Sequence, residues 1–598
     1  MRKGKWKLAY QLLSLCNTGG LPIMDQTQQI PDSSQYYVRG AKDIENIVRY
    51  YYPPRMADDS EDHDYGDSSD STDCLGYQTS QELFKKLLTT LWKHAGPFTV
   101  ICEDYHVDPM YRDSYYSYFS NQHFTMSRFT KRLTFFKNQW KLKEIIVPEN
   151  AEKLNSNFLG TCVICPTDAR TLGRTLLAPA FMLDSGPCYL RLANYSITVF
   201  GVRLNVKAFL FQMQDRETTR CAEVTLLNIL DYFGNSYSDY RTYRPSEIIR
   251  AEQAFSPDRT LPSRGINYFT MSKLLTKFGF SPRLYGKEAI SYGDAPFSEA
   301  KGKSEDWSAI EMRRLLHYYV ESGIPVATNV MWTDSKQMPG HSLVCIGYSG
   351  EQNASRAHEL SASIGGGRKF INSADYYWKY VVIDDNQIPY AVREFRELSC
   401  HQGMTVEYIL VPLYKRMFLE ATDAYDVVTS ILVDPKFGLK SRASKLPEDE
   451  PVVIRLFLAS SRTFKNFRIM NSRAQSNSYR FVYGTTPLPR FIWVAELYRV
   501  SDYETENPQE AAAFGEIILD ATSATKNDIK SVIMLNYPDA VSIRGPDDSI
   551  DALNRCVNGL SLKPFRKFTG NLQEITPQWP QESSDGEMLE SGENSRLT

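Results

Sequence analysis

Three kinds of side chain occur in this sequence in an order that could support nucleophilic chemistry. Cys221 heads a strongly apolar run, His341 follows about 120 residues later, and the acidic pair Asp384 and Asp385 follows His341 by about 43 residues. A thiolate can attack an acyl carbon, an imidazole can hold the thiol proton, and a carboxylate can orient the imidazole. Donors for the oxyanion are also required. The sequence therefore contains a candidate nucleophile, base and orienting acid.

The candidate nucleophile is predicted to lie at the start of a helix. In residues 211–234, Cys221 precedes apolar residues at helical spacing, Thr218 or Thr219 can cap the entry, and Gly234 can end the helix. A thiol in the first turn faces the positive end of the helix dipole, which favours the reactive thiolate. Free cysteines are also among the most buried residue types, so a packing role is the alternative.

The candidate base and acid are predicted to lie on strands. Three strand-like runs cover residues 325–332, 341–350 and 379–386, after a series of helical segments, which indicates an α+β arrangement. His341 starts the second run and the acidic pair ends the third. These ends can meet if the two strands are antiparallel neighbours. Alternation sends the two adjacent carboxylates to opposite faces, so one of them serves His341.

Three motifs carry a resemblance to a known family. They are QDRETTRCAE around Cys221, GHSLVCIGY around His341, and VVIDDN at the end of the third strand. Over residues 205–400 the chain resembles the papain-like cysteine peptidase superfamily, most closely its bacteriocin-processing-peptidase-like branch. The resemblance implies a bacterial protein whose Cys-bearing helix packs on an antiparallel sheet.

The resemblance also implies a role for each site residue. Cys221 is the expected nucleophile, His341 the base and Asp385 the orienting acid, with Asp384 as the alternative. Gln214 is expected to stabilise the oxyanion together with the Cys221 backbone N–H. A peptide or protein is the expected substrate, and no cofactor or metal is implied.

Two other functions remain open on sequence grounds. Gln214 stands seven residues before the cysteine, where the family usually has six, and Ala222 replaces the family's usual glycine. A catalytically inactive papain-like module that binds a peptide or protein is therefore one alternative. A Cys-His-Asp acyltransferase that uses an amine acceptor is the other, because such enzymes share the same residue order.

Other histidines and cysteines fit structural roles better than catalytic ones. His317 lies in an apolar helical segment, while His358 and His401 lie in loop-like stretches. Cys162 and Cys165 form a Cys-x-x-Cys pair inside a strand-like run without a second ligand pair nearby, so we expect core cysteines rather than a metal site.

Composition restricts the setting in which the protein works. The net charge of −3 gives no support for bulk binding to nucleic acid. Ten scattered cysteines in 598 residues indicate reduced thiols and a cytoplasmic location. No apolar run reaches the roughly 18 residues of a membrane span. The N-terminal stretch, with Cys16, resembles a signal or lipid-attachment segment only weakly, and an ordinary helix is the preferred interpretation. The oligomeric state stays open.

The chain is predicted to divide into five segments. A central papain-like domain is flanked by an N-terminal α+β domain and a mainly β C-terminal domain, whose candidate strands include residues 479–485. The acidic run 56–73 and the C-terminal segment are too polar to form a core. The predicted segments are a poorly ordered N-terminal region (1–78), the N-terminal domain (79–204), the central domain (205–405), the C-terminal domain (406–571) and a disordered acidic tail (572–598).

Overall fold

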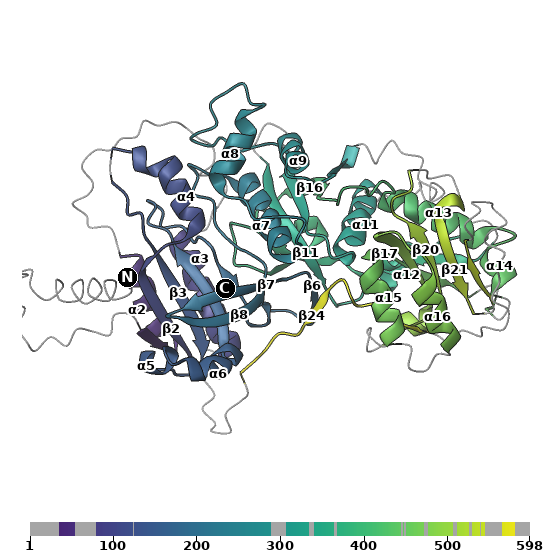
Figure 1. Ribbon diagram of the computed structural model, residues 1–598, viewed down its shortest axis with the longest axis horizontal. Helices are drawn as coiled ribbons and strands as arrows, with labels where there is room; N and C mark the ends of the chain where they lie inside the picture. Colours follow the sequence, from purple (N-terminus) through teal and green to yellow (C-terminus); the bar gives the residue numbers. More distant parts are fainter. Residues whose placement is uncertain are drawn as a thin grey trace, which may run out of the picture.

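Three large sheets lie along the length of the molecule, with helices packed against them (Figure 1), and two further sheets in the described residues have two strands each. The protein is a mixed α/β structure in which nearly all strand pairs are antiparallel, as expected for an α+β fold. The computed structural model describes residues 35–53, 79–123, 125–288, 307–333, 340–363, 367–443, 446–447, 450–471, 477–505, 511–524, 529–538, 540–544 and 565–580.

The N-terminal sheet has five antiparallel strands in sequential order. They are β1 (Gln35–Val38), β2 (Phe98–His106), β3 (Thr130–Lys137), β4 (Phe158–Ile164) and β5 (Leu176–Leu177). Helix α3 (Ser80–Ala95) packs beside α2 (Ala41–Tyr51). The prediction of a poorly ordered segment through residue 78 is therefore wrong for residues 35–53. Helix α2 repeats apolar residues at helical spacing, and its Ile44, Ile47, Val48 and Tyr51 are buried. The acidic run 56–73 lies outside the described residues.

The central sheet carries the strands on which the candidate base and acid were predicted. Its main path runs β15-β14-β11-β10-β16-β9 with antiparallel pairing throughout. The bounds are β9 (Arg283–Gly286), β10 (Val326–Trp332), β11 (His341–Ser349), β14 (Lys379–Ile383), β15 (Ala391–Glu394) and β16 (Met404–Val411). Strands β11 and β14 are direct neighbours, so the start of one lies near the end of the other.

Helix α7 (Cys221–Ser236) packs against β11 and is buried along most of its length. Its N-cap is Arg220 rather than a threonine, and it continues past Gly234. A side chain at Gly234 would come within 2.4 Å of the Arg241–Thr242 backbone, so this glycine permits close packing instead of ending the helix. Helices α8 (Pro245–Gln253), α9 (Tyr268–Lys277) and α11 (Trp307–Glu321) complete the central helical layer.

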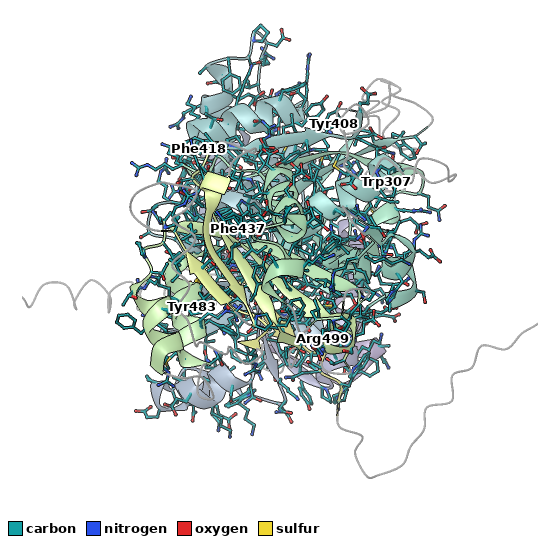
Figure 2. All side chains as sticks on the ribbon, turned by 90° about the vertical axis from the view of Figure 1, so that its right-hand side faces the viewer. Trp307, Tyr408, Phe418, Phe437, Tyr483 and Arg499 are labelled. Atoms are coloured by element: carbon teal, nitrogen blue, oxygen red, sulfur yellow. The ribbon has the colours of Figure 1, made fainter. Side chains whose placement is uncertain are left out.

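The C-terminal sheet has seven strands and is flanked by helices (Figure 2). Its order is β12 (Ala362–Ser363), β13 (Lys369–Asn372), β17 (Val452–Ser460), β18 (Phe491–Arg499), β20 (Gly515–Asp520), β21 (Val532–Tyr537) and β22 (Ala540–Ile543). Helices α13 (Ala421–Val433), α15 (Ser461–Met470) and α16 (Asn477–Thr485) make this region mixed rather than mainly β. The predicted strand 479–485 is part of α16, because periodicity alone does not separate short apolar strands from helices.

The sheets are interleaved in sequence, so the predicted boundaries do not match sheet membership. Strands β12 and β13 come from the chain between β11 and β14, yet they belong to the C-terminal sheet. Strand β6 (Cys188–Leu190) pairs with β11 of the central sheet. Strand β24 (Gln573–Ile575), inside the segment predicted as a disordered tail, pairs with β6 (Figure 1). Backbone pairing orders this segment despite its polar composition, and residues 581–598 lie outside the described residues.

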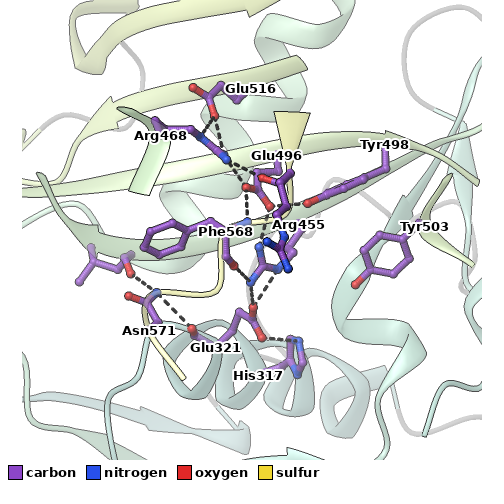
Figure 3. A network of polar contacts seen from close by, with 12 residues as sticks. His317, Glu321, Arg455, Arg468, Glu496, Tyr498, Tyr503, Glu516, Phe568 and Asn571 are labelled. Carbon is purple, nitrogen blue, oxygen red and sulfur yellow. Dashed lines mark hydrogen bonds and ion pairs between the residues drawn. The ribbon is translucent and has the colours of Figure 1, made fainter. Parts of the chain in front are cut away.

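Buried charges connect helix α11 to the C-terminal sheet (Figure 3). Arg455 on β17 donates to Glu321 at the end of α11 (2.8 Å) and to Glu496 on β18 (2.6 Å). Arg468 on α15 then bridges Glu496 and Glu516. All of these side chains are nearly inaccessible to solvent. Alternation of cations and anions lets each buried charge keep an opposite partner.

The described helices include none with the length and apolarity needed to cross a membrane.

Candidate active site

Cys221 occupies the first position of helix α7, and its side chain is partly exposed. Among the described cysteines, Cys400 is the other one with partial exposure, and the remaining five are buried. The Glu223 carboxylate accepts from the Arg220 N–H (3.3 Å) and so caps the first turn. The thiol is thus held at a helix N-terminus beside solvent, where a nucleophile can meet a substrate.

The loop before α7 is folded around Asp215. One oxygen of its carboxylate accepts from the backbone N–H groups of Glu217 (2.9 Å), Thr218 (2.6 Å) and Thr219 (2.8 Å). Arg216 adopts a left-handed backbone conformation with φ of 65°. This turn places Gln214 on the wall of the same cavity as Cys221. Asp215 therefore fixes the position of the candidate oxyanion donor.

His341 is the first residue of β11 and is 4% exposed. Its Nε2 atom lies 2.8 Å from Oδ1 of Asp384, which directly follows β14. Pairing between β11 and β14 brings the two residues together. With Nε2 engaged by the carboxylate, Nδ1 is the ring nitrogen available to a thiol.

Asp384 is held by groups that favour its ionised form. Its carboxylate accepts from the Asn386 backbone N–H (3.0 Å) and from Nε2 of Gln387 (2.9 Å). Burial alone would raise the pKa of Asp384, but the charge of His341, the hydrogen bond to His341 and the one from the Asn386 N–H lower it to about 2. Asp384 is therefore an anion across the physiological range and a fixed acceptor for the histidine.

The charge on His341 is stabilised by its neighbours. Burial lowers the pKa of His341, but the charge of Asp384 and the hydrogen bond to it outweigh that effect. The adjacent Cys221 sulfur raises the pKa of His341 further, through its charge and a hydrogen bond. The result is a pKa well above the ordinary value. The His341 cation is therefore stabilised by the Asp384 carboxylate and lies next to the Cys221 sulfur.

Asp385 lies close to the same histidine but in a different environment. Its Oδ1 is 3.6 Å from Nε2 of His341, and neither carboxyl oxygen makes a well-aligned hydrogen bond. Burial raises the pKa of Asp385 to about 7, and the repulsion of Asp384 contributes to this rise. The sequence analysis preferred Asp385 as the orienting acid. The structure instead places Asp384 at hydrogen-bonding distance, because Asp384 is the residue whose side chain points from the strand end toward β11.

A cavity of about 650 Å³ opens above these residues. Cys221 and His341 line it together with Gln214, so three of the four residues predicted for the site share one cavity. Tyr268 also lines the cavity, and its ring stacks on that of Tyr408 with centroids 3.7 Å apart. The cavity gives a substrate direct access to the thiol and to the base.

His341, Asp384 and Asp385 also have donor atoms close enough to one another for a metal site. One ligand atom from each lies within 4.8 Å of the others, and all three residues are buried. Nitrogen and carboxylate oxygen are common ligands of divalent transition metals. However, the hydrogen bonds from Asn386 and Gln387 already occupy both oxygens of Asp384. This arrangement suits an acceptor for a protonated histidine better than a metal ligand.

Three residues of the site were not identified from the sequence. His401 is buried, and its ring packs edge-on against His341 with centroids 5.6 Å apart. Burial and the charge of Asp384 raise the pKa of the nearby Cys400 to about 12. Asp215 organises the loop described above. His401 and Cys400 lie outside the three motifs, so no sequence signal pointed to them. Asp215 lies inside the first motif, and an Asp before Thr-Thr at a helix entry is a recognisable turn pattern.

The remaining histidines and the cysteine pair lie away from this site. His317 is buried in α11 and stacks on Tyr377. His358 lies on the surface against Glu504. Cys162 and Cys165 are both buried in or beside β4.

No known protein family model matches the sequence, and no curated protein is significantly similar to it.

Proposed function

We propose that this protein is a thiol-dependent hydrolase, most specifically a cysteine peptidase of the papain-like type. The observation that carries the proposal is that His341 contacts both Asp384 and Cys221, with Cys221 and His341 lining one cavity. Three residues far apart in sequence meet through the pairing of β11 with β14 and the packing of α7 on β11. Nucleophile, base and orienting group within contact are the arrangement that covalent acyl transfer requires.

The reaction would proceed in two stages. The Cys221 thiolate attacks the carbonyl carbon of the scissile amide, forming the C–S bond, and the oxyanion is held by Gln214 and the Cys221 backbone N–H. His341 donates its proton to the leaving amine as the C–N bond breaks. A water molecule, deprotonated by His341, then attacks the thioester and releases the acid and the thiolate. Asp384 keeps the imidazole oriented and stabilises its cation throughout.

Selective labelling of one thiol would test the proposal. An electrophilic thiol probe is expected to modify Cys221 faster than any other cysteine, and peptide mapping identifies the labelled site. Cys221→Ala should abolish this label. Cys400→Ala is the matched control, because Cys400 is also partly exposed and close to the triad but has a raised pKa. Labelling that survives in Cys221→Ala and disappears in Cys400→Ala would contradict the proposal.

A metal-dependent hydrolase is the second candidate, because His341, Asp384 and Asp385 gather three donor groups. Inhibitors distinguish the cysteine peptidase from the metal-dependent hydrolase. A cysteine peptidase loses its activity on thiol alkylation and keeps it after chelation with EDTA. A metal-dependent enzyme shows the reverse pattern, and activity should return when Zn²⁺ or Mn²⁺ is restored.

A further inference from the structure

The wall of the candidate active-site cavity is strongly cationic. Arg216, Arg220 and Arg264 line it, and no Asp or Glu is among the described residues that form its wall. All three arginines come from two short segments, the loop before α7 and the loop before α9. The charge at this cavity therefore differs from that of the whole chain, which carries a net charge of −3.

The two arginine-bearing segments are fixed against each other. Arg220 Nε donates to the Ser263 carbonyl (3.1 Å), and the Ser263 backbone N–H donates to the Glu217 carbonyl (2.7 Å). Gly265 has φ of +81°, and a side chain there would meet the Arg220 side chain. Donors that are already held in place lose little conformational entropy when they bind an anion. The two loops therefore form a preorganised binding surface.

Arg220 and Arg264 present charges to the cavity that no described acid pairs with. Neither Arg220 nor Arg264 forms an ion pair with any residue in the described part of the chain, and Arg264 is exposed. Glu223, in the first turn of α7 after Arg220, is buried and accepts from the Ser263 hydroxyl. Burial raises the pKa of Glu223 above its ordinary value. Arginine guanidinium groups in this state are suited to bind carboxylates.

An unpartnered amide on another wall of the cavity independently indicates an acceptor-rich ligand. Asn329 on β10 is 7% exposed, and its side-chain oxygen accepts from the Ser342 hydroxyl. Its Nδ2 group has no hydrogen-bond partner, although Asn329 lines the cavity. A buried donor without a partner costs stability unless a ligand satisfies it. Asn329 and His341 line the same cavity, so one ligand in it can reach both the unpartnered amide and the candidate base.

We propose that this cavity selects peptide substrates that carry a carboxylate next to the scissile bond. The inference rests on the proposed peptidase function and specifies its substrate class. The guanidinium groups of Arg220 and Arg264 bind the carboxylate, and the Asn329 amide donates to a neighbouring acceptor of the peptide. The N-terminus of α7 contributes a further positive potential at the same place.

Matched peptides test the proposal. Amidated octapeptide pools with Glu, Gln or Lys fixed at one position compare a side-chain carboxylate with its neutral and cationic counterparts. A fourth pool, with a free C-terminal acid and no acidic side chain, separates an α-carboxylate from a side-chain carboxylate. Each pool is measured for kcat/KM with the wild-type chain. Binding is measured by calorimetry with Cys221→Ala, so that affinity is read without turnover.

We expect the Glu pool to be cleaved at least about tenfold faster than the Gln pool and to bind more tightly to Cys221→Ala. Arg264→Gln should reduce the Glu-to-Gln selectivity ratio by about tenfold. Arg462→Gln is the matched control, since it removes the same charge from an exposed position on α15 and should keep the ratio. Arg264→Glu should shift the preference toward the Lys pool. Thermal melting establishes that each variant is folded.

The possible outcomes separate this inference from the proposed function. Equal cleavage of the Glu and Gln pools by a chain that depends on Cys221 would overturn the substrate class and leave the peptidase intact. Preference for the free-acid pool alone would overturn the side-chain assignment. Carboxylate-selective binding to Cys221→Ala, without cleavage by the wild-type chain, would support the cavity and contradict the peptidase.

Discussion

The two adjacent aspartates after β14 have opposite protonation properties although they share one histidine. Asp384 is hydrogen-bonded to His341 and has a pKa of about 2, while Asp385 is 3.6 Å from the ring and has a pKa of about 7. The difference follows from their hydrogen bonds, because donors surround Asp384 and leave Asp385 poorly satisfied. One carboxylate is therefore suited to orient the base, and the other to remain largely neutral below pH 7.

Exchange of each aspartate for asparagine should distinguish these roles. Asp384→Asn removes the anion that holds the imidazolium, and we expect kcat to fall by about 10²–10⁴-fold. Asparagine resembles the neutral form of Asp385, and Asp385 makes no well-aligned hydrogen bond. We therefore expect kcat of Asp385→Asn to fall by less than about tenfold. Steady-state kinetics of both variants on one substrate checks this order. A larger loss for Asp385→Asn would assign the orienting role to Asp385.

The same pair gives opposite effects of pH on stability. The pKa of Asp385 is raised from about 4 in the unfolded chain to about 7, so the folded state loses stability as pH rises through this window. Asparagine cannot ionise, and Asp385→Asn should gain stability over the wild type above pH 7, by up to about 4 kcal/mol. The pKa of Asp384 is lowered to about 2, so its contribution is present above pH 4 and lost as pH falls toward 2.

Thermal melting between pH 4 and pH 9 measures this contrast. The Tm difference between Asp385→Asn and the wild type should become more positive with rising pH. The corresponding difference for Asp384→Asn should stay nearly constant across this range, because Asp384 is ionised in both the folded and the unfolded chain above pH 4. Parallel curves for the wild type and Asp385→Asn would show that Asp385 is ionised normally in the folded chain.

At the scale of single elements, the loop before α7 determines where Gln214, the proposed oxyanion donor, lies. The separation of Gln214 from Cys221 is seven residues, and the additional length is accommodated in a turn around Asp215 with Arg216 in the left-handed region. Three backbone N–H groups point at one carboxylate oxygen of Asp215. The seven-residue spacing between Gln214 and Cys221, which left an inactive papain-like module as an alternative, therefore corresponds to a well-formed turn.

A double-mutant cycle should show that Asp215 acts through Gln214. Gln214→Ala is expected to reduce kcat by about 10²-fold or more, as loss of one oxyanion donor does in other enzymes. Asp215→Ala should reduce kcat to a similar extent because Gln214 is displaced. If Asp215 acts by positioning Gln214, kcat of the double variant should be little lower than kcat of Gln214→Ala alone. Additive losses would indicate that Asp215 stabilises the fold without positioning the donor.

Local patterns in the sequence predicted the elements that carry the site, but not the contacts between distant segments. The helix after Cys221 and the strands of His341 and Asp384 follow from periodicity, because each is a long segment with a regular apolar pattern. The choice between Asp384 and Asp385 depends on side-chain direction at a strand end, which a one-residue shift reverses. His401 and Cys400 approach the triad through tertiary packing alone. The strand character of residues 479–485 was wrong because packing as α16 overrode local preference.

At the scale of the whole molecule, the buried charge network joins the central and C-terminal regions. Arg455 lies between Glu321 of α11 and Glu496 of β18 (Figure 3). Removal of one member leaves an uncompensated buried charge, which is far more costly than the net contribution of the pair. The C-terminal sheet and the helix behind the active site are thus coupled energetically.

Arg455→Leu tests this coupling. The substitution leaves Glu321 and Glu496 without their shared cation, and we expect a loss of about 3–5 kcal/mol in the free energy of unfolding. If the regions unfold together, fluorescence and circular dichroism should report one transition at a lower Tm. The exposed Arg490, paired with Asp239 at the surface, provides the control, and Arg490→Leu should change stability by less than about 1 kcal/mol. Two separate transitions in Arg455→Leu would show that the C-terminal region melts independently.

The pairing of β24 with β6 has a consequence for protein synthesis. Strand β6 contacts β11, whose first residue is His341, and β24 covers β6 from the other side. The ribosome must therefore complete residue 575 before the sheet that carries the base acquires all of its described strands. Strand β13, which separates His341 from Asp384 in sequence, pairs with β17 and also depends on chain made later. A nascent chain that already contains Cys221, His341 and Asp384 thus lacks the pairing of β24 with β6 and of β17 with β13 until translation has passed these distal strands.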